Sequence, residues 1–142
     1  MNRHLMFACA ATLAVAAGIT LGLWKLGGRG RQRAISADLR RSQDLQNIAN
    51  AIDSWYRFGE RKLPPDLAAL RPYNSRLSFS DPVTNSPYQY RPTGDTQYEL
   101  CAIFSLDSTA EQSIQPQFGR FYSHPAGRQC FPGNAVRTDL YR

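Results

Sequence analysis

The chain has 142 residues, of which 42% are hydrophobic, 20% charged and 11% aromatic. This length suits one domain, and this composition excludes a chain that is disordered throughout. Three cysteines are too few for a domain that disulfides alone hold together.

The formal net charge of +6 is unevenly distributed along the chain. Residues 34–142 carry 12 basic and 11 acidic side chains, so their net charge is only +1. The excess lies in the first 33 residues, which contain no acidic residue and five basic ones: Arg3, Lys25, Arg29, Arg31 and Arg33. Because these five flank an apolar segment, they indicate a membrane-flanking role. No nucleic-acid partner is expected.

The segment from Leu5 to Trp24 contains no charged residue over twenty positions. At about 1.5 Å per residue, a helix of this length crosses the roughly 30 Å hydrocarbon core of a membrane. We expect a transmembrane anchor over residues 1–26, with residues 5–26 in contact with the membrane. The alternative is a cleaved signal peptide, since Ala14-Val15-Ala16 fits the cleavage pattern, but the apolar run continues past this site.

Two signals bear on the orientation of this anchor. Basic residues after the segment outnumber those before it, which favours a cytoplasmic C-terminal part. That rule loses force when a whole domain follows the helix, and the two cysteines of the domain favour an oxidising compartment. We expect a single-pass protein whose C-terminal domain lies outside the cytoplasm.

A glycine- and arginine-rich hinge is predicted at residues 27–33, before a domain over residues 34–142. A long amphipathic helix then runs from an N-cap at Ser36 to a stop at Gly59. Its apolar face contains Ile35, Leu39, Leu45, Ile48, Ala49, Ile52, Trp55 and Tyr56. The opposite face is expected to carry most of the polar side chains: Arg40, Arg41, Asp44, Gln46, Asp53 and Arg57.

After this helix the pattern predicts a two-turn helix over residues 63–70 and a loop over residues 71–86. Apolar residues then alternate with a period of two. This period predicts strands at residues 88–91 and 97–104, joined by a turn at residues 92–95. One face of the second strand is expected to present Tyr98, Leu100, Ala102 and Phe104. Two short stretches are candidates for another strand pair or a return segment: residues 121–122 and 129–131.

The helix and the hairpin each have one apolar face, and neither face is buried without a partner. We therefore predict an α+β fold with the long helix packed on a small antiparallel sheet of three or four strands.

The order of these elements resembles type IV pilin-like proteins, especially the major pseudopilins of type II secretion. The matching stretches are the helix from Asp38-Leu39 to Tyr56, the turn Leu63-Pro64-Pro65-Asp66-Leu67, and the sheet entry from Asp81-Pro82 to Pro87-Tyr88-Gln89-Tyr90. Tyr98-Glu99-Leu100-Cys101-Ala102 and the stretch from His124 to Cys130-Phe131 are similar to a wider group of uncharacterised bacterial membrane-anchored proteins. The resemblance implies a pilin-like domain at the bacterial inner membrane.

The chain also departs from the pilin pattern. Pilins carry a prepilin peptidase site, with a glycine before an apolar helix and a glutamate near the start of that helix. Here no Gly-Phe pair opens the apolar segment, and residues 1–37 contain no Asp or Glu. An ionisable residue inside a membrane usually has a function. The absence of an acidic residue from this segment therefore indicates a static anchor.

Cys101 and Cys130 are the most specific candidate pair in the sequence, and they are candidates for a disulfide. A disulfide between them would join the hairpin to the C-terminal return and stabilise the domain by about 3 kcal/mol. The alternatives are two reduced cysteines, one or both buried, and a metal or redox site. A zinc site built from these two and His124 would lack a fourth ligand.

The remaining candidate residues favour structural roles. His124 has no evident nucleophile or orienting carboxylate, so a packing or loop role is expected. Oxygen atoms for calcium are available at Asp81, Asn85, Asp95 and Asp107, but their spacing matches no calcium loop. The sequence predicts no catalytic residue, no metal site and no cofactor.

These observations favour a membrane-anchored structural or interaction protein that contacts other envelope or pilin-like proteins through loops at residues 71–87 and 105–119. The alternative is a periplasmic ligand-binding module, although no small-molecule substrate is evident. An enzyme is the least favoured reading.

Overall fold

The structure, a computed structural model, describes residues 12–20, 29–72, 74, 76–109 and 119–136. Contacts divide the chain into two compact units, residues 1–34 and residues 35–142. In the first unit, residues 12–20 are helical, and Thr20 Oγ1 donates a hydrogen bond to the carbonyl oxygen of Ala16 at 3.0 Å. None of the helices in the described ranges is both long enough and apolar enough to span a membrane. Residues 1–11 and 21–26 of the predicted anchor lie outside those ranges.

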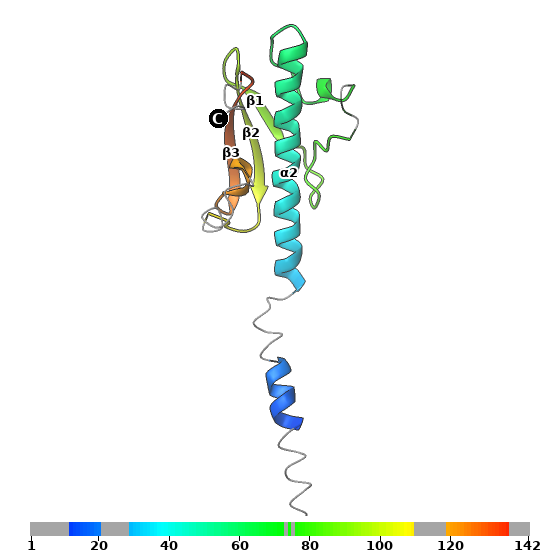
Figure 1. The fold of residues 1–142 in the computed structure, drawn as a ribbon, viewed down its shortest axis with the longest axis vertical. Coiled ribbons are helices and arrows are strands. Elements are labelled where there is room, and N and C mark those ends of the chain that lie inside the picture. Colours follow the sequence, from blue (N-terminus) through cyan, green and yellow to red (C-terminus); the bar gives the residue numbers. More distant parts are fainter. Residues whose placement is uncertain (1–11, 21–28, 73, 75, 110–118, 137–142) are drawn as a thin grey trace, which may run out of the picture. The chain divides into compact units, whose positions relative to one another are not determined.

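The long helix α2 extends from Arg29 to Phe58 (Figure 1). It therefore begins before the predicted N-cap at Ser36, and residues 29–33 of the predicted hinge belong to it. A single glycine costs a helix about 1 kcal/mol, and good helix formers surround Gly30. The helix ends where Gly59 donates a hydrogen bond to the carbonyl oxygen of Trp55 at 2.9 Å. The first two residues of the predicted hinge lie outside the described part.

Three antiparallel strands form one sheet in the order β1-β2-β3. They are β1 (Gln89–Pro92), β2 (Gln97–Phe104) and β3 (Gly127–Asn134). The predicted second strand is confirmed residue for residue, and the return segment is a full strand that pairs with β2 from Phe104↔Gly127 to Gln97↔Asn134. The α+β class, the long helix and the small antiparallel sheet are thus confirmed.

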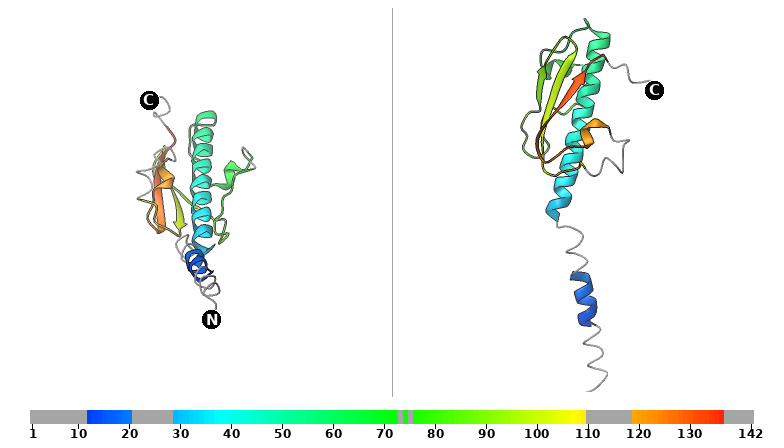
Figure 2. Two further views of the ribbon diagram at one scale, coloured as in Figure 1. Left: turned by 60° about the horizontal axis from the view of Figure 1, so that its bottom comes forward. Right: turned by 90° about the vertical axis from the view of Figure 1, so that its left-hand side faces the viewer.

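One face of the sheet packs against α2 (Figures 1 and 2). The buried core takes Leu45, Ile48, Ala49 and Ile52 from α2, and Tyr98, Leu100, Ala102 and Phe104 from β2. The predicted apolar face of β2 is confirmed in full. The helical stripe is confirmed from Leu45 onward, whereas Leu39 is 47% exposed and is not a core residue.

The segment between α2 and β1 differs from its prediction. Residues 63–70 form only a short 3₁₀ helix, Ala68–Leu70, in place of two helical turns. Two consecutive prolines remove two backbone N–H donors, and so short a helix cannot offset the cost of nucleation. Leu67 and Leu70 are nevertheless buried against the core. Phe121, in a second 3₁₀ helix (Arg120–Tyr122), is fully buried in the same core and contacts the ring of Phe131.

Candidate functional site

A row of polar side chains continues the buried face of α2 toward its N-terminal end. Asp38, Arg41 and Ser42 precede Leu45 at helical spacing, and their exposed fractions are 6%, 4% and 1%. The sequence pattern placed Arg41 on the solvent-facing side, and that expectation is wrong. The same holds for Asp53, which is 8% exposed. Buried charges need partners, so the surroundings of Arg41 define the first feature of the site.

Arg41 reaches three chain segments with its guanidinium group. Its Nε donates to Asp81 Oδ2 at 2.5 Å, and its Nη2 donates to Asp81 Oδ1 at 3.1 Å. Its Nη1 donates to Asp38 Oδ1 at 2.6 Å and to the Ser105 hydroxyl at 3.0 Å. This two-pronged pairing with one carboxylate and contact with a second is the geometry that guanidinium groups favour.

Both carboxylates also bind backbone N–H groups. Asp38 accepts hydrogen bonds from the N–H groups of Ser105, at 2.9 and 3.1 Å, and of Leu106, at 2.9 Å. Asp81 accepts from the N–H groups of Val83 at 2.8 Å and Thr84 at 2.9 Å. The cluster therefore attaches α2 to the end of β2 and to the turn after Ser80.

These contacts control ionisation within the cluster. Burial disfavours the charged form of Asp81, but the hydrogen bonds from Arg41, Thr84 and Val83 outweigh it and lower the pKa of the carboxyl to about 2. The hydrogen bond to Asp81 in turn raises the pKa of Arg41 despite burial. Arg41 and Asp81 are therefore both charged at neutral pH and form an ion pair inside the domain.

A second polar contact lies close by. The Tyr88 hydroxyl donates to Asp44 Oδ2 at 2.9 Å, which ties α2 to the start of β1. Burial raises the pKa of both groups, and the neighbouring carboxylate adds to the effect on Tyr88. The tyrosine therefore stays protonated and holds its place as a donor.

A cleft of about 360 Å³ lies directly beside the Arg41 cluster. One side is the C-terminal half of β2 with Ser105, and the other is the turn from Asp81 to Gln89, with Arg41 at the base and Arg128 at the rim. The cleft exists because β1 pairs with β2 only from Gln89↔Cys101 to Pro92↔Tyr98. Beyond Cys101 the chain that precedes β1 turns away from β2.

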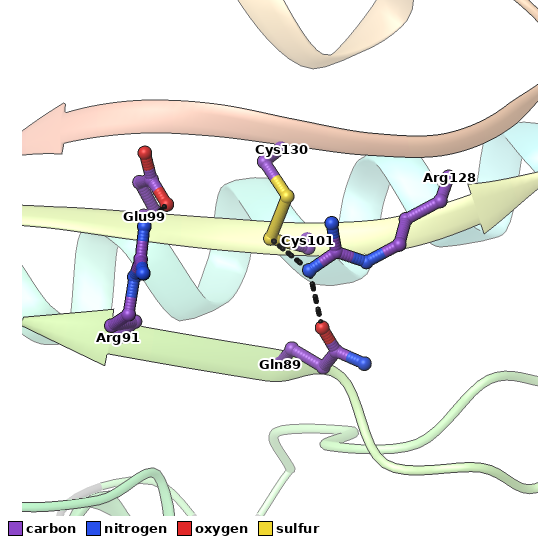
Figure 3. Close-up of a disulfide and its surroundings, with 6 residues drawn as sticks. All are labelled: Gln89, Arg91, Glu99, Cys101, Arg128 and Cys130. Carbon is purple, nitrogen blue, oxygen red and sulfur yellow. Dashed lines mark hydrogen bonds and ion pairs between the residues drawn. A yellow bond between two sulfur atoms is a disulfide. The ribbon is translucent and has the colours of Figure 1, made fainter.

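The face of the sheet that points away from α2 carries the two cysteines (Figure 3). Cys101 and Cys130 are direct partners in the β2–β3 register and are joined by a disulfide, so the predicted pair is brought together. On the same face Arg128 Nη2 donates to Gln89 Oε1 at 2.7 Å and approaches Cys101 Sγ at 3.7 Å. Arg91 pairs with Glu99 at 2.8 Å.

The predicted membrane-flanking residues fall partly outside the described ranges. Arg3 and Lys25 lie outside them. Arg29 belongs to α2, and Arg31 and Arg33 are exposed on that helix. These positions leave the membrane-flanking role a prediction.

His124 takes a packing role, as expected. It is 4% exposed, and its ring stacks on Phe104 with centroids 3.6 Å apart. Burial lowers its pKa, so the ring is neutral at pH 7. Among the calcium candidates, Asp81 is occupied by Arg41, and the described residues contain no group of three His, Cys, Asp or Glu side chains placed to hold a metal ion.

The sequence pattern placed Asp38 within the long helix and Asp81 in the loop before the first strand, but it did not predict that Arg41 and Ser105 join them. One signal was available. Asp38, Arg41 and Ser42 extend the spacing of Leu45, Ile48 and Ile52 without a break, so a stripe defined by spacing alone would have included them.

Comparison of the chain with protein-family models, curated proteins and solved structures finds no match. The resemblance to pilin-like proteins therefore stays a prediction.

Proposed function

We propose that this protein is a membrane-anchored, pilin-like structural or interaction protein of the bacterial cell envelope, linked to type II secretion or type IV pili. It acts without catalysis, and its domain faces the periplasm or the exterior. The observation that carries the proposal is a long helix packed on a three-stranded antiparallel sheet, in a chain with twenty consecutive uncharged residues from Leu5 to Trp24. A helix-on-sheet body of this kind is what the resemblance implies.

The disulfide supports the proposed compartment. Cys101 and Cys130 are bonded across neighbouring strands, and disulfides persist in oxidising environments such as the periplasm. The Arg41 cluster supports the interaction role, because it holds a turn and a strand end in fixed positions on either side of an open cleft. A surface kept in place by buried ion pairs suits the recognition of a partner.

The cleft also favours a second candidate function, a membrane-anchored ligand-binding module. Its volume of about 360 Å³ lies within the usual range of small-molecule sites. Its β2 side offers apolar side chains, and both Arg41 and Arg128 line it. The ligand on this reading is a small organic anion.

Membrane extraction tests the anchor. We expect the full-length chain to stay with membranes after alkaline carbonate treatment, and Leu13→Arg/Val15→Arg to be released, since each charge at mid-membrane costs roughly 3 kcal/mol. Leu39→Arg is the matched control, because Leu39 is half-exposed on α2. Release of the unaltered chain by carbonate would contradict the proposal.

Thiol labelling in intact cells tests the compartment. In a Cys9→Ala background, we expect Cys101 and Cys130 to react with a membrane-impermeant maleimide only after reduction and denaturation. Labelling without reductant, and only after lysis, would place the domain in the cytoplasm and remove the secretion and pilus reading.

In-cell photo-crosslinking separates the two candidate functions. A photoreactive residue at Val83, which is 67% exposed on the cleft wall, should form protein-sized adducts, whereas one at the exposed Ser54 on α2 should not. Absence of adducts at both positions would favour the ligand-binding module.

A further inference from the structure

The C-terminal half of β2 has a strand partner on only one side. Residues 102–104 pair with β3, but β1 begins at Gln89 opposite Cys101, and no other described strand takes its place. Backbone N–H and C=O groups of alternate residues point to the same edge of a strand. At least one residue in this stretch therefore presents both groups to the cleft, which is a template for another strand.

The chain that could have covered this edge is held away from it. Ser80 and Pro87 form an isolated bridge, and Asp81 donates its N–H to the carbonyl oxygen of Ser86 at 2.8 Å, so the turn pairs with itself. The side chain of Asp81 is fixed by Arg41 at the same time. The opening between the turn and β2 is thus built into the fold.

The side chains along this edge alternate in character. Ala102 and Phe104 are buried on the helix side, whereas Ile103 points outward and is 63% exposed. Val83, on the facing wall, is 67% exposed. An added strand would place its inward side chains over apolar surface and one outward side chain beside Ile103.

Arg128 supplies the charge for that outward position. It is the β3 partner of Ile103, and its side chain crosses β2 toward Gln89 at the rim of the cleft (Figure 3). It forms no ion pair with any carboxylate in the described ranges, whereas Arg91 on the same face pairs with Glu99. A guanidinium group has five N–H donors, so Arg128 can bind a carboxylate and keep its contact with Gln89.

We propose that the cleft binds an extended peptide segment of a partner protein, which adds to the sheet beside residues 102–104 with an acidic side chain on Arg128 and apolar side chains on either side of it. Main-chain hydrogen bonds hold the segment, and the alternating side chains select it. The inference rests on the proposed interaction function and names the partner chemistry at the same site.

Peptide selection on the full-length chain in nanodiscs tests this inference. From a random library of short displayed peptides, we expect enrichment of sequences with one Asp or Glu between two apolar residues. Selection on Arg128→Glu should instead enrich Lys or Arg at the central position. Arg91→Glu is the matched control, because it alters the same face away from the cleft, and it should enrich the same peptides as the unaltered chain.

Binding of the best acidic peptide then tests the added strand. Arg128→Glu and methylation of a central backbone nitrogen in the peptide should each weaken binding at least about tenfold, which corresponds to about 1.4 kcal/mol. Amide resonances of residues 102–104 should shift on binding. Enrichment of unpatterned peptides, indifference to backbone methylation, or shifts elsewhere on the domain would overturn the inference.

The outcomes separate this inference from the proposed function. If the chain resists carbonate extraction and Val83 crosslinks in cells but no acidic peptide is enriched, the interaction function stands and strand addition is wrong. If patterned peptides bind but carbonate extracts the chain, the binding mode stands and the membrane-anchored role is wrong.

Discussion

Arg41 and Asp81 are separated by 40 positions in the sequence and form a two-pronged ion pair inside the domain. The pair lies between the helix and the turn that borders the cleft. Both side chains are less than a tenth exposed, and Asp38 and Ser105 complete the surroundings of the guanidinium. The consequence is a turn whose position depends on a buried charge cluster as well as on the packing of the preceding Leu77 and Phe79 against the core.

Arg41→Met should strongly destabilise the domain. Removal of the guanidinium leaves Asp38 and Asp81 without their cation in a buried site, which costs about 3–5 kcal/mol. The free energy of unfolding of the full chain in detergent micelles, from urea titration, measures the loss. Arg40→Met is the control, since this exposed neighbour should change stability by less than about 0.5 kcal/mol. Equal effects of the two substitutions would show that the cluster adds no stability.

Acid should weaken the same cluster. Folding lowers the pKa of Asp81 from its ordinary value of 3.8 to about 2, so the unfolded chain binds a proton more readily than the folded one. The stabilisation, on the order of 2 kcal/mol, is complete above about pH 5 and is lost as the pH falls through 4 and 2 toward about 1. The stability gap between the unaltered chain and Asp81→Asn should therefore close over this interval. A gap that is constant from pH 7 to pH 2 would contradict the assignment.

Reduction of the disulfide should lower stability by about 3 kcal/mol, because the bond closes a long loop between β2 and β3. Urea titration of the Cys9→Ala chain with and without reductant measures this loss. Cys101→Ala/Cys130→Ala should match the reduced chain and show no response to reductant. A response of that double variant would mean that the reductant acts elsewhere.

Ile48→Ala and Leu39→Ala should differ in effect although both residues belong to the apolar pattern of α2. Ile48 is fully buried, so its truncation costs about 2–5 kcal/mol. Leu39 is 47% exposed, and its truncation should cost less than about 0.5 kcal/mol. The same urea titration compares them, and equal losses would show that Leu39 packs in the core after all.

Local patterns predicted the parts of the fold that depend on local physics. The period of two along β2 placed Tyr98, Leu100 and Phe104 on one buried face, and the structure confirms each of them. The presence of two cysteines in a small domain predicted a disulfide between Cys101 and Cys130, and the structure confirms that pairing. The helix predicted at residues 63–70 does not form, because the two prolines and the cost of helix nucleation disfavour so short a helix. The prediction was wrong because periodic spacing of apolar residues gives no information on whether a helix is long enough to be stable.

The sequence by itself determined a long helix, a hairpin and the apolar faces that bring them together, since these follow from the spacing of apolar side chains along the chain. Only the tertiary structure decided that Arg41 points inward, that Asp81 and Ser105 meet it there, and that β1 stops short of residues 102–104. A buried charge is tolerated only where partners from distant segments converge, and no local pattern records that convergence. The cleft and its arginine rim are products of the same long-range packing.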